Sequence, residues 1–302
     1  MKLITEQEVA RVLTYADAAA SLRDAFTQMG RGQAAVLARG RAAAQHDGAA
    51  LMVSAMGACL PALDVLGTKV YSTRNGQFQF VITLFSAHTG LPLVTIEANE
   101  LTRLRTAATT ALAVQTLART DAKVLAIFGA GTQAQAHAEA LKQCLPGRFE
   151  RVLVVARSGA AEFAARIGAE AVDADTALAQ ADVIVTCTRA AEPLFDGSRV
   201  RPGTLVCAVG SSKPVARELD DALLARAALI AVEWKPAAEH EAGEFVRAAA
   251  GTIAPGKVVE LGSLLAAARP LGHEAIVVYK SVGIGLEDVA IAHWVFKKLE
   301  AA

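Results

Sequence analysis

Residues 127–134, with the sequence Ile-Phe-Gly-Ala-Gly-Thr-Gln-Ala, carry the most specific chemical pattern of the chain. They follow an apolar run typical of a buried strand and lead into a stretch of helical composition. Gly129 permits a tight turn, and Gly131 lets the backbone approach a pyrophosphate, which then binds the free N–H groups at the start of the helix. Ala134 replaces a third glycine and is still small enough for close packing of the helix on the strand. The pattern predicts a dinucleotide-binding turn.

The end of the next predicted strand indicates which dinucleotide binds. An NAD-binding protein usually has Asp or Glu there, because a carboxylate binds the ribose 2′-OH. Here the strand at 152–155 runs into Ala-Arg-Ser at 156–158, with no carboxylate. Arg157 and Ser158 can bind a 2′-phosphate through charge and hydrogen bonds. The sequence therefore predicts NADPH, with NADH as a weaker alternative.

The cysteines and histidines do not indicate a metal site. The four cysteines lie far apart without a CxxC pair, and the six histidines form no HxH or HxxxH pair. We therefore expect reduced thiols, as in a cytoplasmic protein, and no bound metal.

Short, almost wholly apolar runs recur after residue 120, and helical stretches such as 133–143 and 160–166 separate most of them. The predicted strands are Val124–Phe128, Val152–Ala156, Val183–Cys187, Leu205–Val209, Leu229–Val232 and Ala275–Tyr279. Continuous apolar strands that alternate with helices imply a parallel sheet covered on both faces. This part of the chain is predicted to be a doubly wound α/β domain of the Rossmann type.

The chain before residue 120 has a different pattern. Two helices are predicted in the first thirty residues, where Thr5 with Glu8 forms a capping box and Thr14 marks a second helix start. Strands are predicted between about residues 36 and 97, with a hairpin turn at 88–90. A helix is predicted over 100–118 and a last one over 287–299.

Length and charge set limits on the function. The 302 residues are enough for about two domains. Because 30 Lys and Arg residues balance 30 Asp and Glu residues and no basic run is present, we expect no nucleic-acid partner. Charged or polar residues interrupt every apolar stretch before the about 20 residues of a membrane-spanning helix, and the N-terminal sequence lacks the apolar run of a secretory signal. The sequence predicts a cytoplasmic protein with a small-molecule ligand.

Several ordered motifs resemble those of the ornithine cyclodeaminase/mu-crystallin family over nearly the whole chain. Residues 101–108, Leu-Thr-Arg-Leu-Arg-Thr-Ala-Ala, are similar to the family signature LTxxRTAA. Met56-Gly-Ala followed by Lys69 is similar to the family's Met-Pro-Ala motif and lysine, and Arg41 is similar to its strand arginine. Residues 209–220 and 280–288 resemble the family's Gly-x-x-x-Pro…Glu-Leu and Lys-Ser-Leu-Gly…Asp stretches.

The resemblance implies a Rossmann domain over residues 119–286 and an α+β substrate-binding and dimerisation domain over residues 1–118 and 287–302. Family members are usually homodimers whose N-terminal strands build an intersubunit barrel, and they bind a small imino or amino acid beside the nicotinamide. The residues expected at the cofactor are Thr106, Gly129, Gly131, Thr132, Gln133, Arg157, Ser158, Thr188, Val209, Gly210 and Gly283.

The resemblance also implies the residues that contact the substrate, which are Arg41, Met56, Lys69 and Arg105. The two arginines are expected to hold a carboxylate by paired hydrogen bonds. Lys69 is expected to protonate or hydrogen-bond the imine, unless the imine arrives protonated from solvent. Ser212 is expected to position the ring nitrogen or a water.

Two departures from the family pattern distinguish the possible reactions. Ornithine cyclodeaminases have an aspartate where this chain has Ser212 and an acidic residue where it has Ser54, so the second ammonium of a diamino acid finds no counterion here. The sequence resembles the ketimine reductases more, and this predicts hydride transfer from NADPH to C2 of Δ1-pyrroline-2-carboxylate or Δ1-piperideine-2-carboxylate, giving L-proline or L-pipecolate. The alternatives are an ornithine or lysine cyclodeaminase, an alanine-type amino-acid dehydrogenase, and a non-catalytic NADPH-binding protein.

Overall fold

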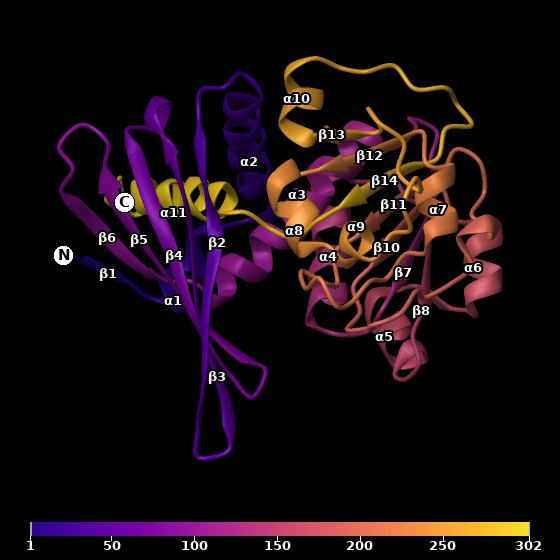
Figure 1. Cartoon of the computed structure of the whole chain (residues 1–302), viewed down its shortest axis with the longest axis horizontal. Helices are drawn as coiled ribbons and strands as arrows, with labels where there is room; N and C mark the ends of the chain where they lie inside the picture. The colour runs from indigo at the N-terminus through magenta and orange to yellow at the C-terminus, as the bar shows by residue number, and fades with distance from the viewer. Residues whose placement is uncertain (1, 302) are drawn as a thin grey trace. The chain divides into compact units, whose positions relative to one another are not determined.

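The computed structural model describes residues 2–301 and divides the chain into two compact units (Figure 1). Met1–Thr109 with Gly283–Ala302 is the mixed-sheet unit, and Thr110–Val282 is the parallel-sheet unit. Helix α3 (Asn99–Leu117) contains the division between them. The domain boundary predicted after residue 118 lies just past the end of this helix and stays a prediction.

The mixed-sheet unit contains a six-stranded sheet in the order β1-β6-β5-β4-β3-β2. Its strands are β1 (Lys2–Ile4), β2 (Ala35–His46), β3 (Ala49–Leu60), β4 (Val65–Arg74), β5 (Gln77–Ser86) and β6 (Pro92–Glu97). Strand β1 runs parallel to β6, and the other neighbours are antiparallel. The predicted hairpin turn joins β5 to β6 and contains Gly90 at φ +71°. Strand β1 was not predicted, because three residues give no readable periodicity.

Helix α11 (Gly285–Glu300) covers one face of this sheet, and α2 (Tyr15–Gly30) packs against α11 (Figure 1). Helix α1 (Glu6–Val12) begins at the predicted capping box, and α2 begins at Thr14, whose side chain accepts a hydrogen bond from the Asp17 N–H. A short 3₁₀ helix, η1 (Pro61–Leu63), joins β3 to β4. Local signals in the sequence therefore determine where both N-terminal helices begin.

The parallel-sheet unit contains eight parallel strands in the order β13-β12-β14-β11-β10-β7-β8-β9. They are β7 (Val124–Phe128), β8 (Arg151–Val155), β9 (Glu170–Ala171), β10 (Val183–Thr186), β11 (Leu205–Ala208), β12 (Leu229–Val232), β13 (Val258–Glu260) and β14 (Val277–Lys280). After β7 the chain adds β8 and β9 on one side and then crosses to β10 on the other. In open parallel sheets, ligands bind at the carboxyl ends of strands where the order reverses in this way.

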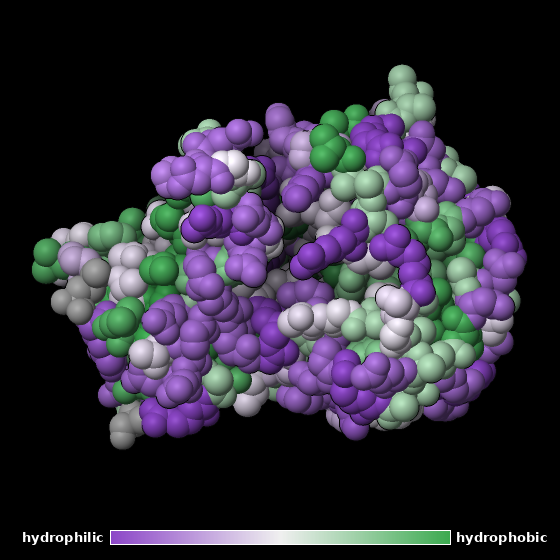
Figure 2. Space-filling view, turned by 90° about the horizontal axis from the view of Figure 1, so that it is seen from below, coloured by the Kyte–Doolittle hydropathy of each residue, from purple (hydrophilic) through white to green (hydrophobic). Residues whose placement is uncertain are grey.

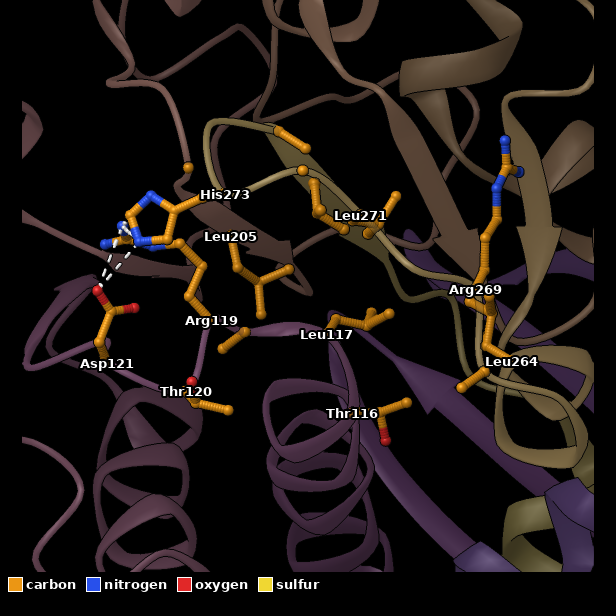
Figure 3. Close-up of a pocket in the computed structure, with 16 residues that line it drawn as sticks. Thr116, Leu117, Arg119, Thr120, Asp121, Leu205, Leu264, Arg269, Leu271 and His273 are labelled. Carbon is orange, nitrogen blue, oxygen red and sulfur yellow. Dashed lines mark hydrogen bonds and ion pairs between the residues drawn. The ribbon is translucent and has the colours of Figure 1, made fainter.

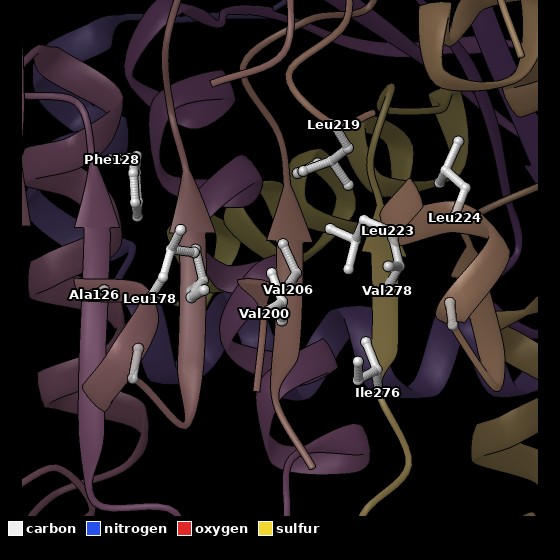
Figure 4. Packing of buried hydrophobic residues seen from close by; sticks show 14 of the residues in the cluster. Ala126, Phe128, Leu178, Val200, Val206, Leu219, Leu223, Leu224, Ile276 and Val278 are labelled. Atoms are coloured by element: carbon white, nitrogen blue, oxygen red, sulfur yellow. The ribbon is translucent and has the colours of Figure 1, made fainter. Parts of the chain in front are cut away.

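The helices of this unit are α4 (Thr132–Cys144), α5 (Ala160–Ile167), α6 (Ala174–Gln180), α7 (Asp221–Arg226), α8 (Lys235–Glu241), α9 (Gly243–Val246) and α10 (Leu261–Ala266), with a 3₁₀ helix η2 (Gly197–Arg199). Figure 4 shows strand residues such as Ala126, Val206 and Val278 in one apolar layer with Leu178 and Leu223 of α6 and α7. The predicted fold class, a doubly wound parallel sheet with a second α+β part, is confirmed. None of the helices formed by residues 2–301 is long and apolar enough to span a membrane.

Candidate functional site

A buried ion-pair cluster lies between the six-stranded sheet and helix α11. The Nζ of Lys69, on β4, donates a hydrogen bond of 2.9 Å to Oδ1 of Asp288, on α11. The guanidinium of Arg105, on α3, contacts the same Oδ1 through Nε at 3.2 Å and donates from Nη1 to Oε2 of Glu287. All four side chains are buried, and both carboxylates are fully so. Charges are retained in a dry interior only when they are paired in this way.

Strand register brings Met56 and Lys69 together. Met56 on β3, Lys69 on β4 and Ile82 on β5 are direct partners across the sheet, so their side chains lie on one face. Helix α11 covers that face because glycines allow a close approach. A Cβ added at Gly285 would lie 2.3 Å from the backbone N of Gly57, so the start of α11 rests directly on β3. This contact brings the two acidic residues of the first helical turn onto Lys69 and Arg105.

Burial and nearby charge oppose one another at Lys69. Its pKa falls from 10.5 to about 8, chiefly because burial disfavours the ammonium, and the cations of Arg105 and Arg39 act in the same direction. The carboxylate of Asp288 raises the pKa and limits the fall. The amine therefore titrates close to neutral pH, which suits a group that exchanges a proton with a ligand.

Arg39 lies close to this cluster, although no sequence motif predicted it. Its Nη2 donates to the Gly283 carbonyl at 2.8 Å and its Nε contacts Sδ of Met56 at 3.3 Å. The predicted Arg41 is exposed, and its register partner is Ser54. The β2–β3 register shifts at an irregularity between Leu37 and Gly40, which contains Arg39 and precedes Arg41. No local sequence pattern predicts this irregularity. Because Ser54 lies two residues before Met56 on β3, the register directs Arg41 to the face that carries Met56 and Lys69.

The acidic pair of α11 was also missed as part of the site. Asp288 was noted only as part of a motif, and Glu287 only as the start of a helix. The sequence does contain a signal for this pair, because two adjacent carboxylates interrupt an otherwise apolar run. In the structure this run is buried from Gly285 to Ala292. Burial on every side of a helix requires that any charge within it be paired.

The predicted dinucleotide turn lies at the carboxyl end of β7, where the strand order reverses. Gly129 has φ +125°, and a Cβ there would lie 2.8 Å from the Cys187 carbonyl oxygen. Gly131 is the N-cap of α4 and has open space around it, with no side chain capping the helix. The buried Oε1 of Gln133, in the first turn, has no hydrogen-bond partner within residues 2–301. Uncapped N–H groups and an open glycine fit a phosphate group.

Arg157 and Ser158 are exposed and follow β8, the neighbour of β7. Val155 is the register partner of Phe128, and its carbonyl accepts a hydrogen bond of 2.8 Å from the Gly129 N–H. The dinucleotide turn and the β8 end with Arg157 therefore lie at one edge of the sheet, as expected for a pyrophosphate and a ribose of one cofactor.

A buried carboxylate organises the other loops at this edge. Glu218 accepts hydrogen bonds from the N–H and Oγ1 of Thr188 at 2.8 and 2.7 Å, and from the Gly210 N–H at 2.8 Å. A Cβ at Gly210 would lie 2.2 Å from the Thr188 carbonyl oxygen, so these predicted cofactor residues lie in direct contact. Val209 and Ser212 are half-buried in the same loop, and Lys280 braces it by donating to the Ser211 carbonyl at 2.8 Å.

The structure thus brings the predicted residues together in two groups. The mixed-sheet group is Met56, Lys69, Arg105 and Gly283, and the parallel-sheet group is Gly129, Gly131, Thr132, Gln133, Arg157, Ser158, Thr188, Val209, Gly210 and Ser212. Gly283 contacts Arg105, because a Cβ there would lie 2.6 Å from the Arg105 Nη1. The Thr106 hydroxyl donates to the Thr102 carbonyl within α3. The roles of all these residues stay predictions.

A cavity of about 360 Å³ lies at the opposite, amino-terminal edge of the parallel sheet (Figure 3). Leu205 and Val277, the first residues of β11 and β14, contribute to its lining. Three of its polar side chains are paired with one another: Arg119 donates to His273 at 2.9 Å, and His273 contacts Asp121 at 3.1 Å. This cavity is separate from the predicted cofactor residues of the parallel-sheet group, which lie at the carboxyl edge.

Known proteins resemble this chain over most or all of its length. The sequence profile described as the ornithine cyclodeaminase/mu-crystallin family matches residues 1–302. Ketimine reductase mu-crystallin of Mus musculus is 34% identical over 263 residues, which cover 84% of this chain and 81% of the mouse protein.

Two solved structures superpose on the whole chain. A probable ornithine cyclodeaminase from Bordetella pertussis Tohama I is 44% identical, with a TM-score of 0.92, and the match covers 100% of this chain and 97% of that one. The Δ1-pyrroline-2-carboxylate reductase of Thermococcus litoralis, solved in complex with NADH and L-proline, is 27% identical, with a TM-score of 0.88 and coverage of 100% and 98%.

Proposed function

The chain belongs to the ornithine cyclodeaminase/mu-crystallin family, and from this membership and its buried cations we propose that it is an NADPH-dependent reductase of a cyclic imino acid. The substrate is Δ1-pyrroline-2-carboxylate or Δ1-piperideine-2-carboxylate, and the product is L-proline or L-pipecolate. The enzyme class is that of oxidoreductases that act on C=N bonds with a nicotinamide cofactor, as the names of its relatives indicate.

The cations at the buried cluster carry this proposal. Lys69 and Arg105 are paired with Asp288 and Glu287, and the guanidiniums of Arg39 and Arg41 lie on the same side of the sheet. Arginine guanidiniums beside a buried lysine favour a ligand that carries a carboxylate. A cyclic imino acid carries one carboxylate and a neutral ring nitrogen.

The same cations disfavour a diamino acid. Ornithine or lysine brings one carboxylate and two ammonium groups, so its net charge is positive. Ser54 is buried next to Arg41 and Tyr71 in the sheet, and its hydroxyl has no hydrogen-bond partner among residues 2–301. Neither Ser54 nor Ser212 supplies a carboxylate for the distal ammonium. Reduction of an imine is therefore favoured over cyclodeamination.

Each group of residues has a chemical role in this reaction. The turn at Gly129–Gly131 would hold NADPH, which would supply a hydride for C2 of the imine. Arg105 and Arg41 hold the substrate carboxylate, which fixes the orientation of the C=N bond. The ring nitrogen gains one proton, which the Lys69 ammonium donates, and the neutral amine of Lys69 is then tolerated by its dry surroundings. Ser212 orients the ring nitrogen.

One assay separates the candidate functions. The purified chain is incubated with NADPH or NADH and each of the two cyclic imines, and in parallel L-ornithine is supplied with NAD⁺ and ammonia is measured. Oxidation of NADPH with an imine and no ammonia from ornithine is the expected result. Ammonia release without added reductant would show a cyclodeaminase, and cofactor binding without turnover of any substrate would show a binding protein.

The preference for NADPH rests on Arg157. Replacing Arg157 by aspartate is expected to raise KM for NADPH by about 10- to 100-fold, because a charge-assisted hydrogen bond of about 1.5–3 kcal/mol is lost and a repulsion replaces it. KM for NADH should change little. Arg166→Asp is a matched control, because Arg166 is another exposed arginine of the same unit. Equal effects of Arg157→Asp on both cofactors would contradict this assignment.

The outer face of the six-stranded sheet is the proposed contact with a second copy of the chain. Val70 and Val81 are direct partners on this face and are 43% and 41% exposed, and Figure 2 shows apolar residues at the surface of this unit, on the left of the picture. The opposite face carries Lys69 and is covered by α11. An exposed apolar sheet face of this kind marks an association surface.

Val70→Asp is expected to convert a homodimer into monomers, because a dimer would bury the carboxylate without a partner. The mass in solution, measured by light scattering across a dilution series, checks this. Val215→Asp, a valine that is 73% exposed in the parallel-sheet unit, is the control and should leave the mass unchanged. A wild-type chain that is monomeric at all concentrations would refute the homodimer.

A further inference from the structure

The two acidic residues of α11, Glu287 and Asp288, form hydrogen bonds with different cations. Asp288 accepts the hydrogen bond from Lys69, whereas Glu287 accepts from Arg105. Both lie in the first turn of a sixteen-residue helix, where the partial positive charge of the helix N-terminus stabilises a carboxylate. Both side chains are fully buried.

Asp288 is the one negative group that contacts Lys69 within residues 2–301. The other neighbours are apolar, aromatic or cationic. Strand β3 supplies Met56, and β5 supplies Ile82 and the ring of Phe80, whose centroid lies 4.4 Å from Nζ. Tyr71 of β4 has its ring centroid 6.0 Å from Nζ. The charged neighbours besides Asp288 are Arg39 on β2 and Arg105 on α3.

These surroundings make the charge of Lys69 depend on one residue. Burial favours the neutral amine, and both arginines repel the ammonium. The hydrogen bond to Asp288 opposes all three effects and also fixes the position of Nζ beneath the helix. The β4 backbone alone does not fix it, because a lysine side chain has four rotatable bonds.

We propose that Asp288 is the positioning residue of Lys69, holding its ammonium protonated and in place for the ligand, while Glu287 positions Arg105. The proposal assigns Lys69 the proton that the imine nitrogen receives, and in that respect it rests on the proposed function. The counterion role of Asp288 does not depend on which substrate binds. It can therefore be tested without turnover.

The first test follows the titration of Lys69 itself. The protein is labelled with ¹⁵Nζ-lysine, the Lys69 signal is assigned with Lys69→Arg, and its midpoint is measured between pH 6 and pH 11. The wild-type midpoint is expected near the pKa of about 8. Asp288→Asn should lower it by at least about one pH unit, so that at pH 8 the protonated fraction falls from about a half to about a tenth or less. An unchanged or raised midpoint overturns the proposal.

Glu287→Gln is the matched control, because it removes the adjacent buried carboxylate of the same helix. Its partner is Arg105, so the Lys69 midpoint should move much less than in Asp288→Asn. A shift as large as that of Asp288→Asn would show a general effect of cluster charge and would overturn the assignment to Asp288. If Asp288→Asn does not fold, Arg39→Gln gives the opposite test. Removal of that repulsive charge should raise the midpoint, and no movement there would also count against the proposal.

The second test uses the reaction. Imine reduction needs the protonated lysine, so kcat should fall as pH rises through the Lys69 pKa. Asp288→Asn should move this alkaline limb to lower pH, whereas Glu287→Gln should mainly raise KM. If the midpoints shift as expected but no imine is reduced, the positioning role stands and the proposed function fails. If the imine is reduced but Asp288→Asn does not change the pH at which kcat falls, the positioning role fails and the proposed function stands.

Discussion

Replacing Arg105 by methionine is expected to destabilise the protein by about 3–5 kcal/mol and to lower kcat/KM on the order of 100-fold. The loss of stability follows from the two carboxylates that the guanidinium contacts, since Glu287 would lose its ion pair with Arg105 and Asp288 would keep its ion pair with Lys69. The loss of activity follows from removal of the guanidinium, whose paired N–H groups are proposed to bind the substrate carboxylate. Methionine keeps an unbranched apolar stem, so the packing of the side chain changes little.

Urea unfolding and steady-state kinetics measure the two effects. Arg103→Met is the matched control, because Arg103 lies on the same helix and also pairs with a carboxylate. That pair, with Glu100, is partly exposed, so its loss should cost about 1 kcal/mol or less. If the two variants unfolded at the same urea concentration, the buried ion pairs of Arg105 would contribute no more to the free energy of unfolding than the partly exposed pair of Arg103, and the prediction would be wrong.

Replacing Gly129 by alanine is expected to cost about 2–5 kcal/mol of stability and to abolish measurable nucleotide binding. Two effects combine here. The φ of +125° is rarely adopted by a residue with a side chain, and the new Cβ would lie 2.8 Å from the backbone oxygen of Cys187. Neighbouring backbone cannot move away as a flexible side chain can, so the turn between β7 and α4 must distort.

Gly131→Ala in the same turn separates binding from folding. Gly131 has φ −93°, and a Cβ there meets no atom within 4 Å, so stability should change by less than about 0.5 kcal/mol. The Cβ nevertheless enters the space in which a pyrophosphate would approach the backbone. We expect the Kd for NADPH to rise about 10-fold or more, by fluorescence titration. Nucleotide affinity equal to wild type would show that the cofactor does not bind at this turn.

Much of the fold was predictable because its signals are local. The capping box at Thr5 and the hairpin turn at Gly90 each depend on residues within a few positions of one another. The strands of the parallel sheet are continuous apolar runs, since both of their faces are covered, and all six predicted ones are present. Strands β9 and β13 were not predicted, because runs of two and three residues are too short to show a pattern.

The candidate site was only partly predictable, because its pairings are distant. The sequence by itself determined the class of fold. It also predicted the dinucleotide turn and, through the family resemblance, the cations at Lys69 and Arg105, and the roles of these residues stay predictions. Only the tertiary structure decided that Lys69 pairs with Asp288, which follows it by 219 residues, and that Arg39 reaches Gly283. Local patterns report the periodicity of one element, whereas a buried charge finds its partner on whichever element packs against it. That packing depends on strand register, on an irregularity in β2 and on the close contact of Gly285 with Gly57, which become visible only when the chain is folded.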